Sequence, residues 1–291
     1  MSSYCKDARM ELTAARVAAF SDDPRGGNPA GVVVGPELPP DDVMQSIATD
    51  VGYSETVFLA GDGGAEWTAR YFSPAAEVPF CGHATIAAAV ALYRQYGATE
   101  LAFDTAAGLV PVAVEEIGGR PWATLTSVEP HVEPLAADAL AQLLAHLHLS
   151  ESELDSRLPP MVAYAGAFHP IIALASRTSH AALSYDFDAL RALMETRDWT
   201  TVQVVWRASE TRFRARDPFP VGGIVEDPAT GAAAAAFGAY LRSIGAVTPP
   251  ASIEIVQGEE IGRPSQIFVA IPREGGIGVT GTAVLIPPPP A

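Results

Sequence analysis

Lysine is almost absent from the sequence. The one lysine is Lys6, and every other basic residue is an arginine. A pyridoxal phosphate enzyme needs a buried lysine for its Schiff base, and a Walker-type phosphate loop needs a lysine after its glycines. Lys6 is poorly placed for the first role and follows no glycine-rich loop. We therefore expect neither of these two chemistries.

Cysteine is scarce, and the histidines lack the spacing of a metal site. Cys5 and Cys81 are the two cysteines, so we expect no disulfide framework and a reducing cytoplasm as the location. The six histidines form no H-E-x-x-H motif. His146 and His148 lie two positions apart in an apparently helical segment, where they would face different ways. We predict no metal site.

Excess positive charge and long apolar runs are also missing. The net charge of −16 argues against nucleic acid or an anionic membrane as the main partner. No apolar run reaches the roughly 18 residues that a membrane span needs, and Met1 to Met10 lack the apolar core of a secretory signal. A small anionic substrate would have to be held by local hydrogen-bond donors, against the field of the whole protein.

Strand-like and helix-like patterns alternate along the 291 residues, enough chain for one large or two medium domains. The patterns predict helices at 41–51, 83–96, 136–148, 187–194 and 229–244. They predict strands at 16–20, 31–34, 56–60, 68–72, 101–103, 110–114, 123–126, 162–165, 170–174, 202–206, 212–216, 253–256, 267–271 and 278–285.

A domain boundary is predicted at Val128–Pro134, which carries two prolines and polar residues without a period. We expect a first half at 1–128, a second half at 129–277, and a last segment, 278–291, that joins the first half. The tail from Pro287 to Ala291 should be disordered or extended.

The two halves resemble each other. Four residues of the first half recur with similar spacing in the second: Arg70, Pro74, Ala84 and Thr85 match Arg214, Pro218, Ala229 and Thr230. Each Ala-Thr pair opens an alanine-rich helix that ends in Gly-Ala, and Ala84 and Ala229 lie 145 positions apart. The pattern predicts an internal duplication, with chance matching among abundant alanines as the alternative. Two helix N-termini could then offer free N–H groups to a carboxylate in a cleft between the halves.

Three side chains are candidates for chemistry, each with a plain alternative. Glu55 precedes an apolar strand and could be a general base at a cleft or a solvated residue at a strand end. His83 stands at a helix start, an unusual place for histidine, and could be a donor beside a bound anion. Asp227 precedes Pro228, where helix capping alone would explain it.

Five segments in order resemble the motifs of the PhzF family, isomerases related in fold to diaminopimelate epimerase. They are Phe20 with Gly27–Val33, Ser54–Phe58, Arg70–Thr85, Glu226–Ala232 and Gln257–Ser265. The resemblance covers nearly the whole chain and implies an α+β fold of two pseudo-symmetric halves. Each half would wrap a mixed, barrel-like sheet around a central helix, with the site between the halves.

The resemblance also implies a function. The expected enzyme is a cofactor-independent isomerase, typical of phenazine biosynthesis, that moves a carbon-bound proton on a small cyclic or unsaturated carboxylic acid. Glu55 would transfer the proton, with His83 and Asp227 assisting, and the protein would be a homodimer. The implied substrate-binding residues are Asn28, Ser54, Gly82, Ala84, Thr230, Gly231 and Ala232.

One departure and two alternatives qualify this interpretation. The family's usual T-G-S-A reads Thr230-Gly231-Ala232-Ala233 here, which removes a hydroxyl at the helix start but leaves the backbone N–H groups. An epimerase or racemase would use two cysteines. Cys81 could be the first, but the matching position, placed at or near Glu226-Asp227, has no cysteine, which leaves only a Cys81/carboxylate pair. A binding protein that kept the fold without the reaction is the other alternative.

Overall fold

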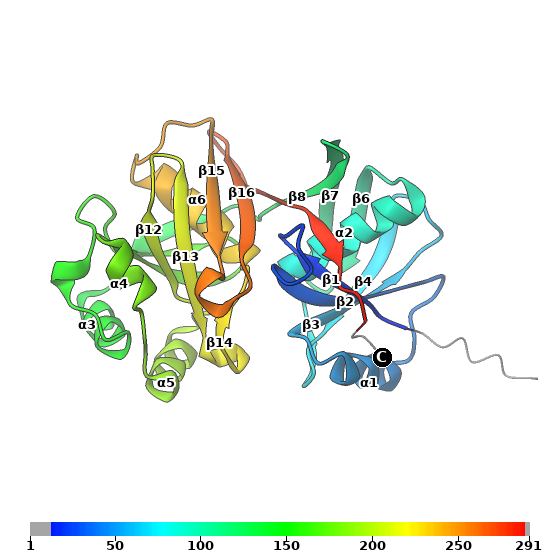
Figure 1. Ribbon diagram of the computed structural model, residues 1–291, viewed down its shortest axis with the longest axis horizontal. Helices are drawn as coiled ribbons and strands as arrows, with labels where there is room; N and C mark the ends of the chain where they lie inside the picture. The colour runs from blue at the N-terminus through cyan, green and yellow to red at the C-terminus, as the bar shows by residue number, and fades with distance from the viewer. Residues whose placement is uncertain (1–12, 289–291) are drawn as a thin grey trace, which may run out of the picture.

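In the computed structural model the chain forms two lobes that lie side by side, and residues 13–288 are described (Figure 1). Met1 to Met10, with Cys5 and Lys6, and the last three residues of the tail lie outside this range. The first lobe contains the strands β1 (Ala15–Ala19), β2 (Asn28–Gly35), β3 (Glu55–Ala60), β4 (Glu66–Phe72), β5 (Glu77–Val78), β6 (Glu100–Thr105), β7 (Gly108–Ile117) and β8 (Arg120–Thr126). Its helices are α1 (Asp41–Val51) and α2 (Gly82–Tyr96).

The second lobe begins with β9. Its strands are β9 (His131–Pro134), β10 (Met161–Tyr164), β11 (Phe168–Leu174), β12 (Gln203–Arg207), β13 (Arg212–Phe219), β14 (Ile224–Asp227), β15 (Ala251–Gln257) and β16 (Ser265–Ile271), followed by β17 (Gly278–Gly281) and β18 (Ala283–Leu285). Its helices are α3 (Ala137–His146), α4 (Arg177–Ala181), α5 (Phe187–Arg197) and α6 (Gly231–Ser243), with short 3-10 turns at Glu151–Glu153, Pro220–Gly222 and Glu259–Ile261.

The order of strand pairing repeats between the lobes. β2 and β3 are parallel, as are β4 and β6, while β1–β2, β3–β4, β4–β5, β6–β7 and β7–β8 are antiparallel. The strands β10 to β17 repeat this sequence of parallel and antiparallel pairs step for step. The expected fold of two similar halves with mixed sheets is confirmed.

The strands that follow β8 and β17 in the chain both cross to the other lobe. β9 follows β8 in the chain but pairs with β10 of the second lobe, while β18 follows β17 but pairs with β1 of the first. β17 itself pairs with both β16 and β8 and so joins the two sheets. The segment 131–134, which we expected to lack regular structure, is therefore a strand.

The central helices are apolar nearly all round because each lies inside a sheet. From Ala84 to Val90 every residue of α2 is buried, and from Ala233 to Leu241 every residue of α6 is buried. Alanine lets sheet and helix approach closely without cost in side-chain entropy. Helix α2 ends at Gly97, whose left-handed φ of 73° provides the C-cap that the sequence predicted.

The register of the duplication differs from the one predicted. Helix α2 begins at Gly82 after Cys81, and α6 begins at Gly231 after Thr230. Cys81 therefore corresponds to Thr230, and not to Glu226-Asp227 as the motif spacing suggested. The loop between β5 and α2 and the loop between β14 and α6 have the same length. The sequence comparison missed this alignment because abundant alanines allow several alignments of the two helices.

The arginine of the repeat was also misassigned. Arg70 on β4 forms an ion pair with Glu77 on β5, and Arg216 on β13 forms the equivalent pair with Glu226 on β14. Arg216, and not Arg214, is thus the counterpart of Arg70. The prediction failed because Arg216 and Glu226 lie three positions further apart in sequence than Arg70 and Glu77, with a register shift between Pro218 and Phe219 in the second hairpin.

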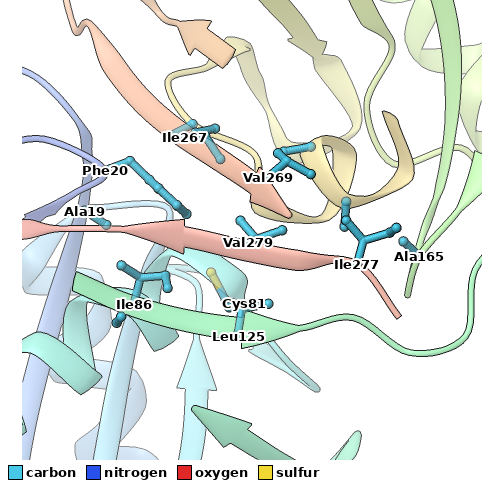
Figure 2. Close-up of a cluster of buried hydrophobic side chains, with 14 of the residues drawn as sticks. Ala19, Phe20, Cys81, Ile86, Leu125, Ala165, Ile267, Val269, Ile277 and Val279 are labelled. Atoms are coloured by element: carbon cyan, nitrogen blue, oxygen red, sulfur yellow. The ribbon is translucent and has the colours of Figure 1, made fainter. Parts of the chain in front are cut away.

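The hydrophobic core is continuous between the lobes. Val279 on β17 lies in one cluster with Cys81 and Leu125 of the first lobe and Ile267 and Val269 of the second (Figure 2). The lobes are thus fixed to each other by a shared core and not only by the connecting chain. Within residues 13–288, every helix is too short or too polar to span a bilayer.

Candidate active site

The candidate residues converge where the N-termini of α2 and α6 meet. Glu55 is the first residue of β3, Asn28 the first of β2, and His83 the second of α2, all in the first lobe. Asp227 is the last residue of β14 in the second lobe. Residues 28, 55, 83 and 227, far apart in sequence, are thereby brought into one hydrogen-bonded group.

Asn28 connects the two lobes at this point. Its Nδ2 donates to Asp227 Oδ1 over 2.8 Å and to the carbonyl of Ala229 over 3.0 Å. The same nitrogen lies 3.2 Å from His83 Nδ1. The side chain is buried, so these hydrogen bonds are shielded from water and fix the position of β14 against β2 and α2.

His83 lies between a carboxylate and a thiol. Its Nε2 is 3.4 Å from Glu55 Oε2 and 3.5 Å from Ser54 Oγ, while its Nδ1 is 3.3 Å from Cys81 Sγ. The Glu55 side chain is 17% exposed and that of His83 is 6% exposed. Glu55 is therefore the member of the group that remains open to a ligand, with the imidazole behind it.

Asp227 is a buried carboxylate with several donors. Besides Asn28, Thr230 Oγ1 donates to its Oδ2 over 2.7 Å, and Gln257 Nε2 donates to its backbone oxygen over 2.7 Å. Burial raises the pKa of Asp227 to about 6, although His83 and the hydrogen bond from Thr230 act in the opposite direction. Helix capping does not explain Asp227, because the N-cap of α6 is Thr230 and the helix starts only at Gly231.

The two helix N-termini approach each other closely. A Cβ built on Gly82 would lie 4.0 Å from the Cα of Gly231, so the first turns of α2 and α6 face the same small space. Neither N-cap residue uses its side chain to cap its helix. The first N–H groups of each helix, including those of Ala84 and Ala232, lack intrahelical acceptors and can hold an anion.

Two residues of the motif Gln257–Ser265, to which we had assigned no role, support this site. Gln257 Oε1 accepts from the Thr230 N–H, and its Nε2 donates to Thr230 Oγ1. Arg263 reaches the other lobe, where its Nε and Nη2 donate to the carbonyls of Gly27 and Gly26, next to Asn28. One short segment therefore holds both Asp227 and Asn28.

Gly27 is required at this crossing for a backbone reason. Its φ of 67° lies in the left-handed region, and its N–H donates to the carbonyl of Pro264 in the second lobe. A side chain at this position would be strained and would collide with β1. The Gly-Gly-Asn motif thus allows the close approach of the lobes.

Cys81 is poorly suited to act as a base or a metal ligand. Its thiol is buried, and burial together with the charge of Glu55 raises its pKa well above the usual value. Glu55, Cys81 and His83 present ligand atoms within 4.8 Å of one another, but metal binding and thiol catalysis both need the thiolate. Its counterpart Thr230 cannot supply the second thiol of a racemase.

Fold and site together define a small-molecule isomerase built from two epimerase-like halves. The sequence matches the family model of phenazine biosynthesis-like PhzC-PhzF proteins over residues 17–287, and the chain belongs to this family. The structure resembles that of a PhzF-family phenazine biosynthesis protein of Bacillus anthracis, with a TM-score of 0.84 and 23% identity. That match covers 95% of this chain and 97% of the other.

Curated relatives carry the same classification. An uncharacterized isomerase of Bacillus subtilis is 32% identical over 94% of this chain and 96% of its own length. The trans-2,3-dihydro-3-hydroxyanthranilate isomerase of Pseudomonas fluorescens is 32% identical over 87% of both chains. The protein is therefore an enzyme of the isomerase class, and the predicted family and class are confirmed.

Proposed function

We propose that the protein moves a proton between carbon atoms of a small cyclic or unsaturated carboxylic acid, with Glu55 as the general acid and base and without a cofactor. The observation that carries this proposal is the position of Glu55. Its partly exposed carboxylate lies at the meeting point of two helix N-termini, 3.4 Å from the buried imidazole of His83. A base and a site for negative charge are thus side by side.

The reaction needs one proton and one pair of electrons to move. Glu55 takes a proton from an allylic carbon, and the electrons left behind shift through the adjacent double bond. The resulting anion is spread over the conjugated system and the substrate carboxylate. Glu55, whose partly exposed carboxyl group can exchange its proton with solvent in between, then delivers a proton to a second carbon, so that the enzyme is unchanged and the double bond has migrated.

The helix N-termini stabilise the negative charge in this scheme. The N–H groups of Gly82, Ala84, Gly231 and Ala232 would receive the substrate carboxylate, which gains charge as the anion forms. Fixed backbone dipoles require little reorganisation during the reaction and are therefore effective catalysts. They also explain how a protein of net charge −16 could hold an anion without an arginine in the site.

His83 and Asp227 have supporting roles in this proposal. His83, whose Nε2 lies 3.4 Å from Glu55 Oε2, orients the Glu55 carboxylate. Ionised Asp227 holds Asn28, and Asn28 in turn contacts His83 Nδ1. Ser54 lies beside the same imidazole nitrogen and could bind a polar substituent of the substrate.

The first experiment measures solvent deuterium incorporation by proton NMR. The protein is incubated in heavy water with trans-2,3-dihydro-3-hydroxyanthranilate, named as the substrate of a relative, and with a panel of cyclic and unsaturated carboxylic acids. Exchange at one carbon together with double-bond migration would support the proposal. Binding without exchange for every acid that binds would contradict it and favour the binding-protein alternative.

Replacement of Cys81 distinguishes this mechanism from a racemase-type one. We expect Cys81→Ala to retain turnover within about threefold, because a protonated buried thiol does not transfer protons at neutral pH. The same exchange assay measures it. A loss of exchange in a variant that keeps its near-UV circular dichroism would instead assign the acid or base role to Cys81.

Arg263 should affect catalysis from outside the site. We expect Arg263→Ala to lower kcat/KM about tenfold, because it removes two hydrogen bonds that hold Gly26 and Gly27 and lets Asn28 move from Asp227. Arg25→Ala is the matched control, since Arg25 lies in the same turn, is 88% exposed and pairs only with Asp23. Equal losses in both variants would show that the turn, and not the contact between lobes, is responsible.

The predicted homodimer and the cytoplasmic location are part of the proposal. Light scattering of the purified protein after size exclusion would decide the first, since a monomeric mass at micromolar concentration would contradict it.

A further inference from the structure

A second carboxyl group lies behind Asp227 and has no assigned role. Asp217 on β13 is the cross-strand partner of Asp227 on β14. Its exposure is zero, and neither of its oxygens has a hydrogen-bond partner among residues 13–288. Directly opposed residues of an antiparallel pair have their Cβ atoms only about 5 Å apart. Two carboxyl groups are therefore buried next to each other at the edge of the active site.

The neighbouring cation cannot compensate a charge on Asp217. Arg216 forms a buried ion pair with Glu226, in which Nε and Nη2 each bind one carboxylate oxygen. Its Nη1 donates to the backbone carbonyls of His180, Ala181 and Leu183. None of these five hydrogen bonds is made to Asp217, and Glu226 adds negative charge nearby.

The neighbouring neutral donors are occupied as well. Thr230 has one hydroxyl hydrogen, which goes to Asp227 Oδ2. Gln257 has two amide hydrogens, which go to the Asp227 carbonyl and to Thr230 Oγ1. In this arrangement the hydrogens of Thr230 and Gln257 are directed to atoms other than the carboxylate of Asp217. A protonated Asp217, in contrast, could donate to a free lone pair of Thr230 Oγ1 or Gln257 Oε1.

We propose that Asp217 is a neutral carboxylic acid at physiological pH and acts as a positioning residue that leaves Asp227 as the charged member of the pair. Burial and the charges of Asp227 and Glu226 raise the pKa of Asp217 well above its usual range, and they outweigh the opposite effect of Thr230 and Gln257 beside it. If Asp217 ionised, two adjacent carboxylates would repel each other and Asp227 would be displaced from Asn28. The inference rests on the role of Asp227 in the proposed function.

The charge state can be tested without a substrate. Wild-type protein with ¹³C-labelled aspartate carboxyl carbons is titrated by NMR across the neutral range. We expect one aspartate signal to stay at the protonated chemical shift at pH 7, and to be absent from Asp217→Asn. If that variant does not fold, Asp217→Ser serves for the assignment. Ionised shifts for every aspartate at pH 7 would overturn the proposal, whatever the reaction of the enzyme is.

The functional consequence appears in the alkaline part of the pH profile. Wild-type kcat/KM should fall at alkaline pH as Asp217 ionises, and Asp217→Asn should shift this fall upward because an amide keeps the donor and cannot ionise. Asp217→Leu, which lacks the donor, should have a kcat/KM about tenfold lower than wild type at all pH values. Asp217→Asn, which keeps the donor, should restore kcat/KM. Cys81→Ala is the control for thiol titration and should keep the wild-type fall. The same alkaline limb in wild type and Asp217→Asn would refute the positioning role.

Discussion

Glu55→Gln should reduce kcat by about 10² to 10⁴, the range that general acid–base catalysis supplies. The amide has the same shape as the carboxylate but cannot accept a proton from carbon. Binding should change little, because substrate anions would be held by the helix N-termini. The deuterium exchange assay measures the effect directly, with KM from the same progress curves.

Glu66→Gln is the matched control for this variant. Glu66 is the first residue of β4, as Glu55 is of β3, but its side chain is exposed and takes no part in the site. Its replacement should leave exchange unchanged. Equal exchange by wild type and Glu55→Gln would remove Glu55 from the mechanism and direct attention to Asp227 and His83.

Asp227→Asn should lower activity and at the same time change how stability depends on pH. Loss of the charged acceptor for Asn28 removes about 1.5 to 3 kcal/mol of interaction, which corresponds to about 10- to 100-fold in kcat/KM. Wild-type activity should fall as pH decreases through about 6, where Asp227 becomes protonated. The variant should lack this step.

The stability effect has a definite sign. The pKa of Asp227 rises from 3.8 to about 6 on folding, so the folded state binds more protons between these values and stability decreases as pH rises through them. At pH 7 the ionised group costs about 3 kcal/mol relative to a neutral one. Urea unfolding of wild type should therefore show this decline, and Asp227→Asn should not.

Asp155 is a control of opposite sign. It is also 6% exposed, but Arg157 holds its pKa below the usual value through hydrogen bonds and charge. Its contribution to stability is present above the unfolded pKa of about 4 and is lost only as pH falls below it. Asp155→Asn should thus lower stability at pH 7. An equal response of both variants would show that burial of Asp227 has no energetic cost.

The sequence predicted the parts of the fold that depend on local pattern. The two alanine-rich helices, the helix 41–51 and most strands followed from apolar periodicity and glycine breaks. Four candidate residues, Asn28, Glu55, His83 and Asp227, proved to lie together because the ordered motifs resemble those of a family. Their roles in catalysis remain predictions until the variants above are measured.

Other features could not be predicted because they depend on long-range pairing. The segment Val128–Pro134 contains two prolines that suggest a linker, and only the pairing of its last four residues with β10 makes β9 a strand. Which residues of the two halves correspond depends on the three extra positions between Arg216 and Glu226. The sequence did not indicate a role for Asp217. Nothing in the local sequence shows that the hydrogens of Thr230 and Gln257 are directed to other acceptors.

The exchange of final strands between the lobes has a consequence for folding. Because β18, the last strand of the chain, completes the first sheet, the first half of the chain does not contain all the strands of its own lobe. β1 can pair with β18 only after the chain has formed a loop of more than 260 residues. Such non-local pairing slows folding, since the loop must close before the contact stabilises it. The enzyme therefore cannot be divided at its apparent boundary into two autonomous folding units, and the active site forms only when the whole chain has folded.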